Sequence, residues 1–320
     1  MKIFKNEMKK TIFTNLIIII SFFLIFEIIL RAFNLSSLRG ISESYLLDKK
    51  NTEGKVFGEK FFTDNTGMRI PFKNFKYNPE NKNIVLVGDS FVFGPGINEE
   101  NTFAGKLRIF KSNINIFNSS KPGNNLNDYF YDIKFFYEKY NSNKFYIFVN
   151  FDDVRIYNKD LNKKKINNKK RTFENFRNVK FIGKVNNFLR SKFHTYIFLI
   201  GLTTDPVKRY YYLSEKMFKS QFVIKKFNSD ILKINKFLND NNLDGTFFIT
   251  PYNYQLRKKC TQTEQVPQKE ISKIFKIHNI NFHDFTSSFC NKNKNLFINF
   301  DPTHLSKHGH DIIFDYLKNL

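Results

Sequence analysis

The chain has 320 residues, which is enough to bury a full core in one domain or at most two. Its formal net charge of +23 would by itself suggest a nucleic-acid partner. However, the basic residues are mostly lysines scattered along the chain, with no aromatic RNA-binding motif and no zinc-finger spacing. We therefore interpret the charge as a solvated, Lys-rich surface and predict no nucleic-acid partner.

The N-terminus predicts a membrane anchor. An almost continuous apolar run, Leu16–Phe26, follows four lysines: Lys2, Lys5, Lys9 and Lys10. Residues 11–33 are long enough to cross a bilayer as one helix, and the lysines predict that residues 1–10 stay in the cytoplasm. A cleaved signal peptide is the alternative, but its apolar core is normally shorter and no small-x-small cleavage site follows. Glu27 and Arg31 are four residues apart and are predicted to pair.

Residues 34–80 are polar and irregular, and they are predicted to be a membrane-proximal connector with possible short strands. From residue 81 to 320, strands alternate with helices, which predicts an α/β domain with a parallel sheet. The expected strands are 84–87, 114–117, 144–149, 245–249 and 280–285. The expected helices are 102–110, 127–140, 231–237, 264–277 and 308–317. A Lys- and Asn-rich insertion is expected at about 155–228, with its most basic cluster, at 162–171, in an exposed loop.

Two short motifs lie at opposite ends of this domain. The apolar strand 84–87 ends at Gly88-Asp89-Ser90, and an Asp-Pro-Thr-His segment places Asp301 three residues before His304. A serine at the carboxyl end of a buried strand lies where open α/β sheets bind their ligands. A carboxylate can orient an imidazole, and that imidazole can take the proton of a serine hydroxyl. We therefore predict Ser90 as nucleophile, His304 as general base and Asp301 as its orienting residue.

Each of these residues also has a simpler interpretation. Ser90 could be an ordinary helix N-cap, Asp301 a turn residue before proline, and His304 a surface histidine. His308 and His310 lie in the same segment and are expected on the solvent face of the following helix. Asp89 is interpreted as a structural residue that orders the loop.

Three segments together resemble the SGNH/GDSL hydrolases. They are Asn65-Thr66-Gly67-Met68-Arg69, then Gly88-Asp89-Ser90-Phe91-Val92-Phe93-Gly94-Pro95-Gly96, and finally Asp301-Pro302-Thr303-His304-Leu305-Ser306. The serine does not stand in the Gly-x-Ser-x-Gly elbow of classical α/β-hydrolases. The resemblance covers most of the chain after residue 60, with a divergent middle. It implies a three-layer α/β/α sandwich with a flavodoxin-like, five-stranded parallel sheet.

The resemblance also implies an oxyanion hole with three donors. The amides of Ser90 and Gly123 match two of them. The third is an asparagine side chain in the family, and here Asp152 stands in its place. An ionised carboxylate would repel an oxyanion, whereas a protonated one could donate a hydrogen bond. Asn150, two residues earlier, is the alternative donor.

From these residues we predict a membrane-anchored serine esterase whose catalytic domain lies outside the cytoplasm. The resemblance, together with this location, suggests an O-acetyl ester of an envelope glycan as the first substrate to test. An O-acyltransferase using the same acyl-enzyme is one alternative, and a noncatalytic envelope-assembly protein is another. No cofactor or metal is predicted. Cys260 and Cys290 could form a disulfide in an exported domain or remain free thiols.

Overall fold

The computed structural model describes residues 2–33, 49–157, 185–186, 188–189, 192–203, 205–261, 263–290, 292, 295–299 and 301–320. The predicted basic loop at 162–171 lies outside these ranges. The chain forms two compact units, one of residues 1–42 with 171–205 and one of residues 43–170 with 206–320. The second unit contains both sequence motifs.

The smaller unit contains helices α1 (Lys2–Ala32) and α8 (His194–Thr203). The segment Glu7–Ala32 of α1 has a mean hydropathy of 2.6 and is long and apolar enough to cross a membrane. The predicted pair is present, with Arg31 Nη2 at 2.7 Å from Glu27 Oε1. The Glu27 carboxylate also accepts the backbone N–H groups of His194 (2.9 Å) and Thr195 (2.7 Å), so it caps the first turn of α8.

The larger unit is built on an eight-stranded sheet with the order β1-β2-β3-β5-β4-β6-β7-β8. Five neighbouring strands are parallel: β5 (Ile114–Asn118), β4 (Lys82–Val87), β6 (Lys144–Val149), β7 (Asp244–Ile249) and β8 (Phe282–Asp284). Numbered along the chain, their order is 2-1-3-4-5, which is the flavodoxin-like arrangement. The predicted five-stranded parallel sheet is therefore confirmed.

Three antiparallel strands extend this sheet beyond β5. They are β1 (Glu53–Val56), β2 (Glu59–Thr63) and β3 (Arg69–Ile70), with Arg69 paired to Asn118 of β5. All three come from the segment that the sequence placed in the connector. They cover what would otherwise be an open edge of the parallel sheet.

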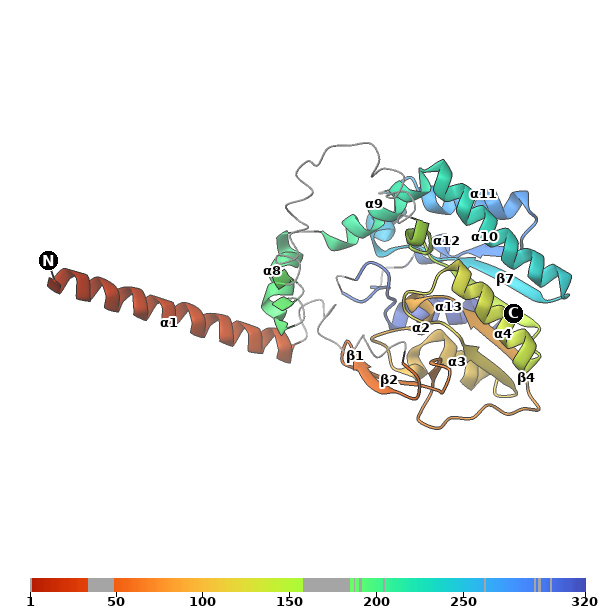
Figure 1. The fold of residues 1–320 in the computed structure, drawn as a ribbon, viewed down its shortest axis with the longest axis horizontal. Coiled ribbons are helices and arrows are strands. Elements are labelled where there is room, and N and C mark those ends of the chain that lie inside the picture. The colour runs from red at the N-terminus through yellow and green to blue at the C-terminus, as the bar shows by residue number, and fades with distance from the viewer. Residues whose placement is uncertain are drawn as a thin grey trace. The chain divides into compact units, whose positions relative to one another are not determined.

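Helices cover both faces of the sheet and make three layers (Figure 1). One face packs against α4 (Leu126–Tyr140), α9 (Pro206–Phe218), α10 (Gln221–Asp240) and α11 (Val266–Ile277). The other packs against α2 (Ser90–Phe93), α3 (Phe103–Phe110), α12 (Thr286–Cys290) and α13 (Lys307–Leu317). Central strands are buried on both sides: Val85 and Val87 of β4 join the first core, while Ile84 and Leu86 join the second. Short 3-10 turns are η2 (Glu99–Asn101), η3 (Asp153–Tyr157) and η4 (Asn253–Cys260).

Three local features differ from, or go beyond, the sequence prediction. The helix expected at 231–237 begins at Gln221, and α9 in the predicted insertion carries the fully buried Tyr211 into the core. The expectation that His310 faces solvent is wrong: its ring is buried, and Nδ1 accepts the backbone N–H of Phe103. Cys260 and Cys290 are joined in a disulfide.

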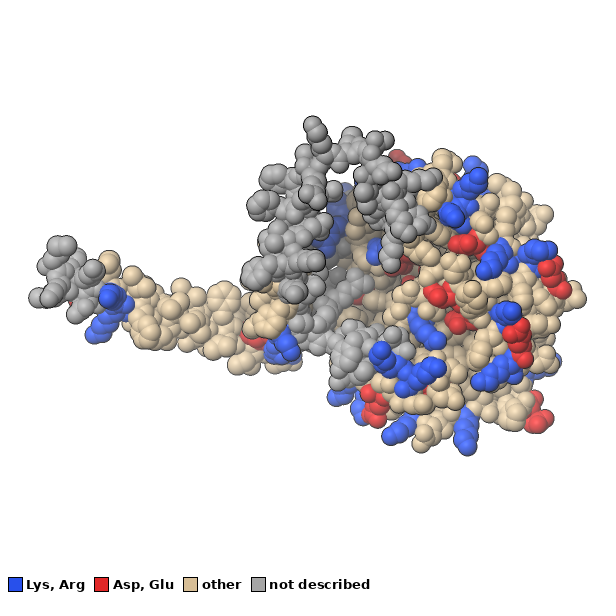
Figure 2. All heavy atoms as spheres, in the orientation of Figure 1, with Lys and Arg blue, Asp and Glu red and all other residues tan. Residues whose placement is uncertain are grey.

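The charged residues on the face seen in Figure 2 are dispersed. Lysines and arginines lie apart from one another over the larger unit, with acidic residues between many of them. On that face the described residues therefore form a mixed, solvated surface rather than a continuous basic patch.

Candidate active site

The Gly-Asp-Ser motif forms the tight turn from β4 into α2. Ser90 is the first residue of α2, and the side chain of the N-cap residue Asp89 accepts the N–H of Phe91 at 2.9 Å. A Cβ atom on Gly88 would lie 2.3 Å from Cγ2 of Val92, so only glycine fits at this turn. The turn leaves the half-buried Ser90 side chain at the carboxyl end of the sheet.

The Asp-Pro-Thr-His segment brings a carboxylate and an imidazole to this serine. Nε2 of His304 lies 2.9 Å from Oγ of Ser90, although the two residues are 214 positions apart in the chain. Nδ1 of His304 lies 2.8 Å from Oδ2 of the buried Asp301. The other oxygen of Asp301 accepts the backbone N–H groups of Thr303 and His304, each at 2.8 Å.

These contacts define one chemical arrangement. The carboxylate of Asp301 favours the imidazole tautomer with a proton on Nδ1, which leaves Nε2 free to accept the serine proton. Two backbone bonds and the ring contact hold Asp301 in place. The three predicted residues are therefore brought together in the order and at the spacing that serine nucleophile activation requires.

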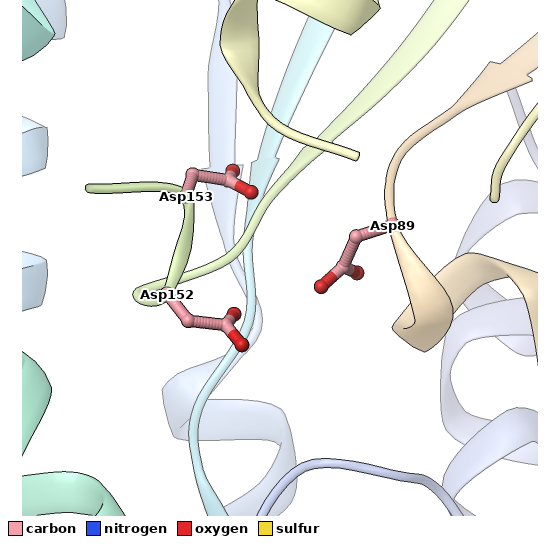
Figure 3. A group of neighbouring side chains, drawn as sticks. All are labelled: Asp89, Asp152 and Asp153. Carbon is pink, nitrogen blue, oxygen red and sulfur yellow. The ribbon is translucent and has the colours of Figure 1, made fainter. Parts of the chain in front are cut away.

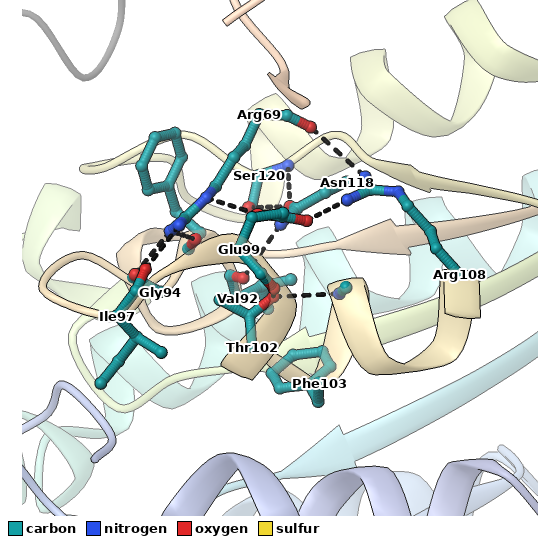
Figure 4. A network of polar contacts seen from close by, with 12 residues as sticks. Arg69, Val92, Gly94, Ile97, Glu99, Thr102, Phe103, Arg108, Asn118 and Ser120 are labelled. Carbon is teal, nitrogen blue, oxygen red and sulfur yellow. Dashed lines mark hydrogen bonds and ion pairs between the residues drawn. The ribbon is translucent and has the colours of Figure 1, made fainter. Parts of the chain in front are cut away.

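A buried arginine holds the loop that follows Ser90 and helix α2 (Figure 4). Arg69 of β3 is fully buried and donates to the carbonyl oxygens of Phe93 (2.7 Å), Gly94 (2.5 Å) and Ile97 (2.6 Å). Its Nε lies 2.6 Å from Oε2 of Glu99, whose other oxygen pairs with Arg108. The guanidinium thus donates hydrogen bonds to carbonyl oxygens at the end of α2 and in the loop beyond it. These bonds connect β3 to the turn that carries Ser90.

Three carboxylates lie on the other side of the turn. The side chains of Asp89, Asp152 and Asp153 point into one gap beyond the ends of β4 and β6 (Figure 3). Their nearest oxygen atoms all lie within 4.8 Å of one another. The nearby guanidinium of Arg155 is 4.0 Å from Asp152.

This cluster has the residue types of a cation site, but five of its six carboxylate oxygens already accept hydrogen bonds from the protein. Asp153 accepts from Tyr129 and from the backbone of Asn150, both at 2.9 Å. Asp152 accepts from Tyr210 at 2.5 Å, and its Oδ1 is the one carboxylate oxygen of the three residues without a hydrogen-bond partner in the described part of the chain. We therefore assign no metal to it.

Burial and like charge instead favour protons in the cluster. Burial, followed by the charge of Asp152, raises the pKa of Asp89 to about 8. Burial and the charges of Asp89 and Asp152 also raise the pKa of Asp153 well above its ordinary value. A carboxyl group that keeps its proton near neutral pH can donate a hydrogen bond as well as accept one.

The predicted oxyanion donors lie in different settings. The Ser90 amide is at the start of α2, where helix N–H groups have no intrahelical partner. Gly123 lies in an exposed turn at φ +88°, a conformation that favours glycine. The side chain of Asn150 donates to Oδ2 of Asp89 at 3.2 Å, so this amide is already hydrogen-bonded to the carboxylate cluster. The roles of these residues stay predictions.

Sequence reasoning did not single out Glu99, Arg108, Tyr210 or Phe57. Glu99 and Arg108 are nine positions apart and belong to different elements, so no local spacing links them. Tyr210 reaches Asp152 from a helix in the predicted insertion. Phe57 lies beside His304, with ring centroids 6.2 Å apart, and comes from the predicted connector.

No family model and no curated protein matches this chain. It is similar in structure to a lipolytic protein of the G-D-S-L family from Desulfitobacterium hafniense, at 16% identity over 75% of this chain and 99% of that one, with a TM-score of 0.42.

Two further solved structures give the same kind of likeness. One is the esterase EstA from Pseudoalteromonas, at 15% identity, covering 75% of this chain and 96% of that one, with a TM-score of 0.43. The other is the acetylxylan esterase Axe2 from Geobacillus stearothermophilus, at 12% identity, covering 75% and 94%, with a TM-score of 0.40. At such scores and identities the chemistry has to be argued from the residues of this chain.

Proposed function

We propose that the protein is a serine esterase of the SGNH/GDSL type. The observation that carries the proposal is the continuous chain of contacts from Asp301 through His304 to Ser90, with heavy-atom distances of 2.8 and 2.9 Å. The motifs around these residues resemble that family, and the flavodoxin-like sheet places the serine at the carboxyl end of its first parallel strand.

In the proposed reaction, Oγ of Ser90 attacks the ester carbonyl while Nε2 of His304 takes the serine proton. The tetrahedral oxyanion is stabilised by backbone amides, with Ser90 and Gly123 as the candidates. His304 then donates its proton to the departing alcohol. Water, deprotonated by the same imidazole, attacks the acyl-serine and releases the acid and Ser90.

The N-terminal helix supports a location at the membrane. Because four lysines precede the apolar run Leu16–Phe26 within the candidate span Glu7–Ala32, we place the N-terminus in the cytoplasm and the larger unit, with the proposed esterase site, outside it. We take short acyl esters as the substrate class, with O-acetyl groups of an envelope glycan tested first. A reporter fused after residue 320 should be exported, and protease added to spheroplasts should digest the esterase unit. Protection of that unit in intact spheroplasts would contradict this topology.

A fluorophosphonate probe tests the chemistry without knowledge of the substrate. Ser90→Ala and His304→Ala should each lower labelling or ester turnover on the order of 10⁴-fold, and the double variant should match the single ones because the residues act as a unit. Asp301→Asn should impair less than Ser90→Ala, since the nucleophile remains.

The exposed His308, four residues after the proposed base, provides the matched control. His308→Ala should label like the wild type. Full ester turnover by a folded Ser90→Ala variant would refute the mechanism. Partition of the acyl group between water and an added glycan would separate a hydrolase from an acyltransferase.

A further inference from the structure

The turn between β1 and β2 has an unusual residue at its tip. Val56 pairs with Glu59, so the hairpin is closed by only two residues, Phe57 and Gly58. Both have positive φ, +51° and +84°, as in a type I′ turn. Asparagine, aspartate or glycine normally occupies the first of these positions, because a bulky side chain is strained there.

The strained position puts the Phe57 ring beside the proposed catalytic base. The rings of Phe57 and His304 lie with centroids 6.2 Å apart at an angle of 50°. The Phe57 side chain also contacts Gly96 in the loop after the nucleophile: a Cβ there would come within 2.8 Å of Phe57 Cδ2 and 2.9 Å of Ile298 Cδ1. Only glycine therefore leaves room for this ring.

Phe57 is not fully buried. The residue is half-buried, and it packs at the edge of the small apolar cluster of Val56, Phe61 and Phe93. A side chain needed only for packing could lie wholly within that cluster without occupying a strained backbone position. Strain of this kind persists where the surrounding structure enforces it, and it is concentrated at functional sites.

We propose that Phe57 is a specificity-determining residue that binds the alcohol part of the ester. This inference rests on the proposed esterase function. His304 must donate its proton to the leaving alcohol, so that part of the substrate lies next to the imidazole and therefore next to Phe57. A rigid aromatic face binds flat, partly apolar surfaces, and the C–H face of a sugar ring is such a surface. The substrate class is thus an O-acylated sugar.

The substitution Phe57→Asn separates this role from a structural one. Asparagine is favoured at this turn position, so the variant should fold with an unchanged or higher Tm while lacking the ring. We expect kcat/KM for an acetylated methyl glycoside to fall about tenfold or more, mainly through KM. Ethyl acetate, which has the same acyl group and no sugar, should be cleaved with nearly unchanged kcat/KM.

Phe57→Tyr keeps the aromatic face and should retain the preference for the sugar ester. Phe72, an exposed phenylalanine of the same unit, provides the control: Phe72→Asn should change neither ester. Fluorophosphonate labelling of Ser90 is measured in parallel, because the probe contains no sugar.

Equal kcat/KM changes for both esters in Phe57→Asn, or a lowered Tm with loss of both activities, would show that the ring only packs the hairpin and would overturn the inference. In those cases wild-type labelling still supports the esterase. Absence of labelling and ester cleavage in the wild type would overturn the esterase proposal itself, and this inference with it.

Discussion

Two polar clusters flank the turn that carries Ser90, and they accommodate buried charge in opposite ways. On one side, Arg69 and Arg108 share Glu99, and the remaining guanidinium donors of Arg69 are taken up by carbonyl oxygens. On the other side, Asp89, Asp152 and Asp153 bring three groups of the same sign together. The first cluster keeps its charges because its two cations pair with one carboxylate, whereas burial and like charge favour protons in the second. One should therefore be insensitive to pH and the other should titrate.

The largest effect is expected from Arg69→Met. Removing the guanidinium leaves Glu99 with one cation and several loop carbonyls without donors, so the free energy of unfolding should fall by about 3–5 kcal/mol. Because arginine stays charged at all relevant pH values, the loss should be the same at pH 6 and pH 9. Denaturant unfolding of the full chain in detergent measures it.

The exposed pair of Lys60 and Glu53, 3.4 Å apart, is the matched control. Lys60→Met should cost less than about 1 kcal/mol. If Arg69→Met lowers the free energy of unfolding as little as Lys60→Met does, the cluster of Arg69, Glu99 and Arg108 does not stabilise the turn that carries Ser90.

A smaller, pH-dependent effect is expected from Asp89→Asn. The pKa of Asp89 is about 8 in the folded chain and ordinarily 3.8, so the folded state holds the extra proton between these values. Wild-type stability should therefore fall as pH rises from about 4 to about 8, at up to about 1.4 kcal/mol per pH unit. Asparagine can still cap α2 and does not titrate, so the variant should lose this slope.

Because neighbouring carboxylates share the proton, we expect the difference to be about 2 kcal/mol by pH 8 rather than the full value. The free energy of unfolding measured from pH 4 to pH 9 in both proteins gives the result. Identical slopes would remove Asp89 as the titrating group.

The smallest effect is expected from Asp152→Asn. A neutral amide at this position could donate to the oxyanion, and one such donor is worth on the order of 100-fold in rate. We expect a gain of about tenfold, because the Tyr210 hydroxyl already engages residue 152.

Ester-cleavage rates of the wild type, Asp152→Asn and Asn150→Ala decide which residue is the donor. A flat response to Asp152→Asn with a large loss for Asn150→Ala would assign the third donor to Asn150. In that case the carboxylate cluster would stabilise the fold and would take no part in binding the oxyanion.

The parts of the structure that could be predicted are those with short-range signals. The apolar run at 84–87 followed by Gly-Asp-Ser located both the first parallel strand and the serine. The helix α13 also carried a signal that could have been used: His310, Ile313 and Leu317 share one face, and all three are buried.

The antiparallel strands between residues 53 and 70 could not be predicted in the same way. They are short and carry charged side chains, and they are held by long-range pairing such as that of Arg69 with Asn118. The meeting of Asp89 and Asp152 likewise depends on the pairing of β4 with β6, which brings together two loops that are distant in the chain.

The disulfide gives the proposed location of the larger unit a chemical consequence. Cys260 closes the turn that follows β7, and Cys290 ends the helix that precedes the segment carrying Asp301 and His304. The half-cystines are 30 positions apart in the chain, and closing a loop of that length destabilises the unfolded state, through lost entropy, by about 3–4 kcal/mol. That contribution exists only where thiols are oxidised, so a chain retained in a reducing compartment would fold without it. The disulfide would then form only after export. The segment that carries the proposed base would therefore reach its final stability only where the protein acts.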